Sequence, residues 1–190
     1  MVNYIADNPR RLAVKQANPD LFTVVRDLEV APGWRCPGIG NLFLLQRPVM
    51  RQVRISRSVS PEALAENKAE LLAAAEHGTV LVSPCISPGE KDIAHAALDT
   101  GFPLIVMLTD GLPKAYKPPG RYFDACAKGN LLMLAPFPFH RGKQTITREQ
   151  CLKLNEWAAR VVAPEPGAGN PGSGAGPGTE PVSGAAPAPE

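Results

Sequence analysis

The chain has 190 residues, of which 44% are apolar, and a formal charge of +2, which is ordinary for one globular domain with its own core. It contains no run of the roughly 18 apolar residues that a membrane helix needs, and Asp7 and Pro9 stand where a signal peptide would be apolar. We therefore expect a cytoplasmic protein with no membrane partner. The four cysteines form no Cys-x-x-Cys pair and are accompanied by only three histidines, so we expect no metal site, no disulfide framework and no cofactor.

Residues 1–39 are predicted to form an extension before the main domain. The segment Asn3–Gln16 has a helical pattern around the Asn8-Pro9 pair, and Phe22–Val30 is rich in the apolar and β-branched residues of a strand. The pattern leaves open where these two segments lie relative to a sheet.

A regular alternation of strands and helices begins near residue 50. Met50–Ser56 alternates apolar and polar side chains as a half-buried strand does, and Ser60-Pro61 begins a helix that runs to Gly78. The later elements repeat this order: strand 79–83, helix 90–100 closed by Gly101, strand 103–109, short helix 121–128 ended by Gly129, strand 131–135, and a helix to about residue 162 that opens at Thr147 with Gln150 in capping-box position.

This alternation predicts the fold class. Strands that are apolar on both faces and are followed by helices are typical of a parallel sheet covered on both sides. We expect residues 40–163 to form an α/β, Rossmann-like domain with a mainly parallel sheet, helices on both faces and ligand binding at the carboxyl ends of the strands. Residues 164–190 hold seven prolines, seven glycines and three glutamates but no lysine or arginine, so we predict a disordered tail, and the rest of the chain carries a charge of +5.

The turn after the first of these strands is a candidate anion site. Ser56, Arg57 and Ser58 lead into a helix start, where free backbone amides and the helix dipole favour phosphate. Plain capping of the helix is the alternative role for the same turn.

The turn after strand 79–83 is a second candidate. Ser83 ends the strand, Gly89 permits close approach of a ligand, and Lys91 adds positive charge. Glu90 and Asp92 are the only carboxylates here that could act in catalysis, and the alternative is that they only complement the helix dipole.

A long loop, residues 109–124, interleaves basic and aromatic side chains. Tyr116, Lys117 and Arg121 are suited to hold a nucleic-acid backbone and stack on its bases. The alternative is that the tyrosines, which stand near prolines, only pack the loop onto the core.

Several segments together resemble the DNA-processing protein A (Smf) family. The runs GNLFLLQRP, VRISRS, TVLVSPCISPGEKDIAHAAL, PLIVMLTDGLPKAYKPP and LLMLAP follow the order and spacing of that family's landmarks over about 120 residues. The resemblance implies a domain that binds single-stranded DNA, hands it to a recombinase and pairs with a second copy. By position it assigns site roles to Ser56, Arg57, Ser83, Gly89, Tyr116 and Arg148, whereas Ile55 and Pro84 stand where the family has glycines.

A shorter resemblance concerns the first 20 residues. The run YIADNPRRLAV is similar to the closing helix of REP-associated single-tyrosine (HUH) transposases. It implies either that Tyr4 is a nucleophile or that residues 1–20 are the remnant of a transposase-associated protein.

The leading hypothesis is a non-catalytic domain that binds the phosphates of single-stranded DNA or of a nucleotide. The contacts expected from side chains are made by Ser56, Arg57, Lys91, Lys117, Arg121 and Arg148. One alternative is an enzyme that cleaves the base–ribose bond of a nucleoside phosphate with Glu90 or Asp92, and another is a domain that senses a nucleotide.

Overall fold

The computed structural model describes residues 2–142 and 145–163, with side chains from Asn8 onward. The predicted disordered tail, residues 164–190, lies outside the described residues. The elements follow in the order α1 (Val2–Ala17), η1 (Pro19–Phe22), β1 (Val25–Ala31), β2 (Trp34–Gly40), η2 (Leu42–Gln46), β3 (Met50–Gln52), α2 (Pro61–Glu76), β4 (Val80–Ser83), α3 (Pro88–Thr100), β5 (Leu104–Met107), α4 (Gly120–Ala127), β6 (Leu131–Leu134) and α5 (Arg148–Val162).

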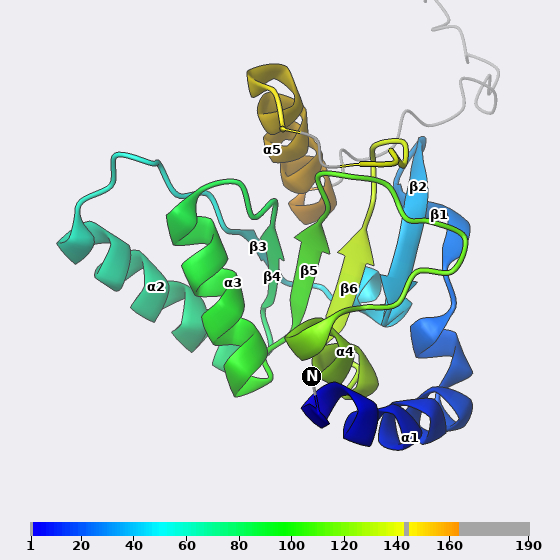
Figure 1. The fold of residues 1–190 in the computed structure, drawn as a ribbon. Helices are drawn as coiled ribbons and strands as arrows, with labels where there is room; N and C mark the ends of the chain where they lie inside the picture. The colour runs from blue at the N-terminus through cyan, green and yellow to red at the C-terminus, as the bar shows by residue number, and fades with distance from the viewer. Residues whose placement is uncertain (1, 143–144, 164–190) are drawn as a thin grey trace, which may run out of the picture.

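A six-stranded sheet with the order β1-β2-β6-β5-β4-β3 runs through the middle of the molecule (Figure 1). Strands β3, β4, β5 and β6 are parallel, whereas β2 pairs antiparallel with both β1 and β6. Leu81, Leu104 and Leu131 lie side by side in register and are fully buried. The predicted fold class, α/β with a mainly parallel sheet, is confirmed.

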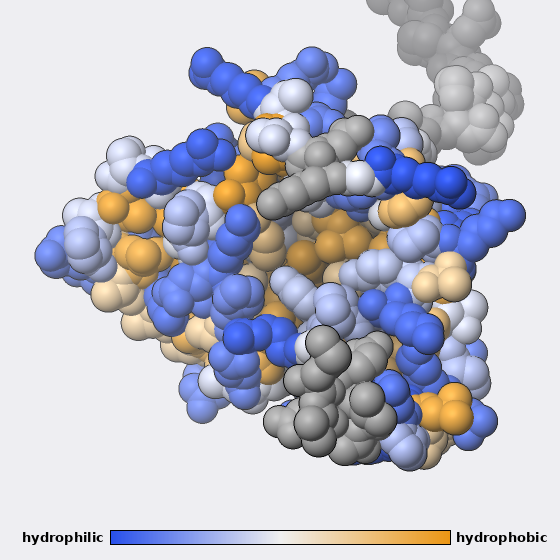
Figure 2. Space-filling model, viewed as in Figure 1, coloured by the Kyte–Doolittle hydropathy of each residue, from blue (hydrophilic) through white to orange (hydrophobic). Residues whose placement is uncertain are grey.

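Helices cover both faces of this sheet, as predicted. Successive strand residues point to opposite faces, so Leu104 belongs to the core cluster that includes Ile93 of α3, whereas Ile105 belongs to the cluster that includes Leu154 of α5. The helices α2, α3 and α4 lie on one face and α5 on the other (Figure 1). On the face seen in Figure 2, apolar surface gathers at the middle, over β5 and β6, with hydrophilic residues around it. No helix among the described residues has the length and apolar character to span a membrane.

Local capping explains where the helices begin. Ser60 caps α2 and accepts a hydrogen bond from the amide of Ala63, as the Ser60-Pro61 pair predicts. Thr147 and Gln150 form the expected capping box of α5. The helix predicted from residue 90 begins two residues earlier, at Pro88, because Ser87 caps it.

The N-terminal 39 residues share the sheet with the rest of the chain. The predicted strand Phe22–Val30 is β1, which begins at Val25 because Pro19–Phe22 forms a 3-10 turn. The unpredicted strand β2 joins it to β6. The expected boundary between residues 39 and 40 falls inside β2, so the hairpin and the parallel strands form one continuous layer.

The helix expected around Pro9 is also present and is continuous from Val2 to Ala17. It packs against η1 and α4 at the edge of the molecule, where Arg10 pairs with Asp124 at 3.0 Å and the rings of Phe22 and Phe123 stack with centroids 4.8 Å apart. These contacts anchor α1 beside the start of α4 (Figure 1).

Candidate functional site

A pocket of about 730 Å³ opens at the carboxyl ends of β3 and β4. Three segments form its walls: residues 54–57 after β3, residues 86–90 around the start of α3, and residues 146–155 of α5 and the turn before it. We call this pocket the β3–β4 crevice. It lies at the edge where parallel sheets bind ligands, and it brings together the two turns that the sequence singled out.

Three arginines line the β3–β4 crevice: Arg54, Arg57 and Arg148. All three are exposed. Within residues 2–142 and 145–163, none of their side chains forms an ion pair or a hydrogen bond. The crevice therefore holds three guanidinium groups that are available to a ligand.

The carboxylate that faces this crevice, Glu90, is engaged by the backbone. Its side chain is only 3% exposed. One oxygen accepts a hydrogen bond from the amide of Ile55 at 3.3 Å, and the other accepts from the amides of Ile86 and Ser87 at 2.7 and 3.2 Å. Glu90 thus ties the turn after β3 to the start of α3, and it occupies the amides that a phosphate would otherwise use.

The serines of the first turn lie beside Arg57. Ser56 and Ser58 are exposed, their hydroxyl oxygens are 2.9 Å apart, and the amide of Ser58 donates to Ser56 Oγ at 3.2 Å. Since Ser60 caps α2, neither of the two predicted serines is needed for that cap. Ser56 lines the crevice, whereas Ser58 supports the turn from outside it.

Ser83 and Gly89 are packed inside the protein and do not line the β3–β4 crevice. Ser83 is fully buried, and its oxygen accepts the amide of Cys85 at 3.2 Å. A Cβ atom on Gly89 would lie 2.6 Å from Ile55 Cγ2 and 3.0 Å from Leu64 Cδ1. The close approach that this glycine permits is therefore made by side chains of the protein itself.

Lys91 and Asp92 lie on the exposed side of α3, and neither lines the crevice. Asp92 pairs with Lys68 of α2 at 2.9 Å, with half of its side chain exposed. This contact links α2 to α3 and places the second candidate acid away from the arginines.

The loop 109–124 leads to a different part of the surface. Tyr116 packs against the core, and burial raises the pKa of its phenol to about 12. Arg121 pairs with Asp99 at 3.2 Å. Lys117 lines another pocket, described below. The structure therefore does not bring these three predicted contacts to the crevice that holds Arg57.

Asp110 of the same loop pairs with His140 of the loop after β6, a pair that the sequence did not single out. Asp110 Oδ1 accepts hydrogen bonds from the amides of Gly111 and His140 at 2.8 and 3.0 Å and lies 3.2 Å from His140 Nδ1. The pair joins the loops that follow β5 and β6, and it stands apart from the lining of the β3–β4 crevice.

Sequence reasoning missed Arg54, Cys151 and Asn155 in the crevice. Arg54 could have been found, because it is two residues from Ser56 and a strand places such residues on one face. Asn155 Oδ1 is buried with no hydrogen-bond partner among the described residues.

Among the four cysteines, Cys151 is the one that lines the β3–β4 crevice. Burial raises the pKa of Cys36 and Cys85 to about 11 and that of Cys126 to about 12. Cys151 is partly exposed and lines the crevice beside Arg148. The reactivity of its thiol should therefore report whether a ligand occupies the β3–β4 crevice.

The residues proposed for other chemistry are not assembled into a centre. Tyr4 lies in α1, and its side chain is outside the described part of the chain. Among the described residues, no group of three histidine, cysteine or acidic side chains is placed to hold a metal ion.

Comparison of the chain with protein-family models, with curated proteins and with solved structures yields no match.

Proposed function

We propose that the protein binds the phosphates of single-stranded nucleic acid, or of a nucleotide, in the β3–β4 crevice without transforming them. The observation that carries this proposal is the set of three exposed arginines, Arg54, Arg57 and Arg148, which lack partners among the described residues and line one pocket at the carboxyl edge of the sheet. Arginine suits this role because its planar fork matches the oxygens of a phosphate.

The rest of the lining suits a nucleotide more than a bare anion. Ile86 and Ile146 give apolar surface next to the arginines, against which a sugar or base can pack. The resemblance of segments within residues 40–163 to the DNA-processing protein A (Smf) family supports the same ligand class.

The state of the two candidate acids supports the proposal of binding without catalysis. Cleavage of a base–ribose bond needs a carboxylate free to act on water or on the base. Both oxygens of Glu90 accept backbone hydrogen bonds, and Asp92 pairs with Lys68. Incubation with nucleoside monophosphates should therefore release no free base, as followed by chromatography.

The binding itself is tested by titrating a labelled oligothymidine of about 15 nucleotides at several salt concentrations. With up to three arginine–phosphate contacts, the plot of log affinity against log salt should have a slope of about −2, because each phosphate neutralised on a single strand contributes about −0.7. Arg57→Gln should weaken binding about tenfold at low salt and make the slope shallower by about 0.7.

Arg47→Gln is the matched control. Arg47 is exposed and stands before β3, so it lies at the opposite end of that strand from the crevice. Replacing Arg47 removes the same charge as replacing Arg57. The affinity for the oligonucleotide should change less than twofold, because a distant surface charge contributes only a screened, nonspecific attraction. Absence of binding at low salt, or equal losses for the two variants, would disprove the proposal.

A further inference from the structure

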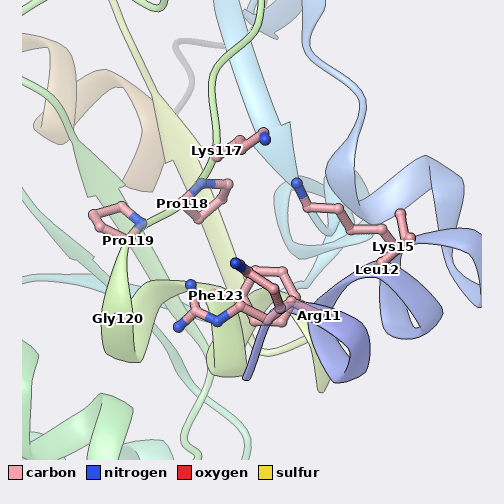
Figure 3. Close-up of a pocket in the computed structure, with 9 residues that line it drawn as sticks. Arg11, Leu12, Lys15, Lys117, Pro118, Pro119, Gly120 and Phe123 are labelled. Carbon is pink, nitrogen blue, oxygen red and sulfur yellow. The ribbon is translucent and has the colours of Figure 1, made fainter. Parts of the chain in front are cut away.

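A second pocket lies between α1 and the start of α4, and it shares no lining residue with the β3–β4 crevice. Its volume is about 380 Å³. Arg11, Leu12 and Lys15 of α1 form one wall, and residues 117–123 form the other (Figure 3). We call it the α1–α4 pocket.

Three cations converge on this pocket from segments about a hundred residues apart in the sequence. Lys15 and Lys117 extend from opposite walls with their amino groups turned toward each other, and the guanidinium of Arg11 lies 4.6 Å from the ring centre of Phe123 (Figure 3). Among the described residues that line the pocket there is no acid. Asp124 of α4 pairs instead with Arg10.

The surroundings of Lys15 disfavour its charged form in the protein alone. Partial burial, then the charge of Lys117 and then that of Arg11, hold the pKa of Lys15 below its ordinary value. An anion between the two lysines would remove that repulsion. The pocket is thus arranged for a negatively charged ligand.

The start of α4 adds to the same field. The helix begins at Gly120, and Pro119, at its N-cap, supplies no side-chain acceptor for the first amides. A Cβ at Gly120 would have no heavy atom within 4 Å, so there is space next to the helix end. The helix dipole favours an anion at this end.

The remaining lining is apolar. Leu12 is 58% exposed at one wall, and Pro118, Pro119 and Phe123 form the other. We propose that the α1–α4 pocket is a second binding site that takes a small phosphate monoester, with the phosphate between Lys15 and Lys117 and an apolar or aromatic body against Leu12 and the prolines.

The test is a titration of the full chain with phenyl phosphate at low salt, followed by the amide signals of Gly120 and Lys117 in ¹H–¹⁵N NMR spectra. Both signals should shift and saturate. Inorganic phosphate should shift the same signals but bind with at least threefold weaker affinity, because it lacks the apolar body. A loss of this size corresponds to about one small apolar contact. Phenol should leave them unshifted.

Three variants locate the site. Lys15→Gln and Lys117→Gln should each weaken phenyl phosphate binding about tenfold, the loss expected for one charge-assisted contact. Lys114→Gln is the matched control, because Lys114 is an exposed lysine of the same loop that does not line the pocket, and it should change affinity less than twofold. Arg57→Gln should leave the Gly120 shift unchanged, since it acts only at the β3–β4 crevice.

The two proposals can therefore fail separately. A Gly120 signal that does not move with phenyl phosphate, or a loss that is equal for Lys114 and Lys117 variants, overturns the second site whatever the oligonucleotide titration shows. Equal affinity for inorganic phosphate and phenyl phosphate overturns the proposal that an apolar body packs against Leu12 and the prolines. A shift at Gly120 that disappears in Arg57→Gln would show that only one site exists.

Discussion

Replacing Glu90 with alanine is expected to lower the free energy of unfolding by about 3 to 5 kcal/mol. The carboxylate accepts hydrogen bonds from the amides of Ile55, Ile86 and Ser87, and its removal would leave these donors in a closed part of the structure. The measurement is urea-induced unfolding followed by circular dichroism. Glu90→Gln should lower the free energy of unfolding by about half as much. The glutamine side chain keeps one oxygen that accepts a hydrogen bond, but it places an NH₂ donor against a backbone N–H donor.

Asp92→Ala is the control for that change. Asp92 is two residues further along α3, and its pair with Lys68 is half exposed, so its loss should cost less than about 1 kcal/mol. If the Glu90 variant were as stable as the Asp92 variant, the Glu90 carboxylate would be available for chemistry and the enzyme alternative would regain its acid.

Gly40→Ala is the second change with a large expected effect, a loss of about 3 to 5 kcal/mol in unfolding free energy. Gly40 ends β2 with a φ of +118°, and an added Cβ would lie 2.1 Å from the carbonyl oxygen of Leu131. That oxygen accepts the amide of Asn41 at 2.9 Å. The added methyl group and the hydrogen bond from Asn41 to Leu131 cannot both be accommodated. The pairing of β2 with β6 must therefore open at this point.

Gly33→Ala separates backbone strain from this collision. Gly33 has a φ of +67° in the β1–β2 turn, with no heavy atom within 4 Å of the added Cβ, and its replacement should cost only about 1 kcal/mol. Far-ultraviolet circular dichroism and tryptophan fluorescence should show one common transition for both variants, since Trp34 lies on β2 in the same sheet. Two separate transitions would mean that the hairpin folds apart from residues 40–163.

The parallel part of the fold could be predicted from sequence because its signals are local. The apolar runs at Leu104–Met107 and Leu131–Leu134 are buried on both faces, which is why they lack alternation. Caps such as Ser60 and Thr147 mark the helix starts directly. The order of elements and the covering of both sheet faces follow from these signals.

The two strands next to this region depend on distant partners. The segment of β2, WRCPGIG, has glycines and a proline that suggest a loop, yet Gly40 is needed because the backbone of β6 approaches it closely. The predicted strand Met50–Ser56 stops at Gln52, because the Ile55 amide turns to Glu90 instead of to β4. A long-range contact decides the outcome in both cases.

The candidate site was predictable in part. Ser56, Arg57 and Arg148 do come together at the carboxyl edge of the sheet, which is what a parallel sheet dictates for the turn after β3. The loop 109–124 does not line the β3–β4 crevice, and its course past the sheet edge could not be predicted because it depends on tertiary packing. It contributes Lys117 to the α1–α4 pocket instead.

The most direct test of the proposed function is the reaction rate of Cys151 with a thiol reagent at about pH 8. Burial raises the pKa of Cys36 and Cys85 to about 11 and that of Cys126 to about 12, so these three thiols should react slowly. The phase that belongs to Cys151 is identified as the one that vanishes in Cys151→Ser. We predict that saturating oligothymidine slows this phase severalfold at low salt, and that the protection is lost at high salt. An unchanged rate with the oligonucleotide bound would show that the ligand sits elsewhere and would contradict the assignment of the β3–β4 crevice.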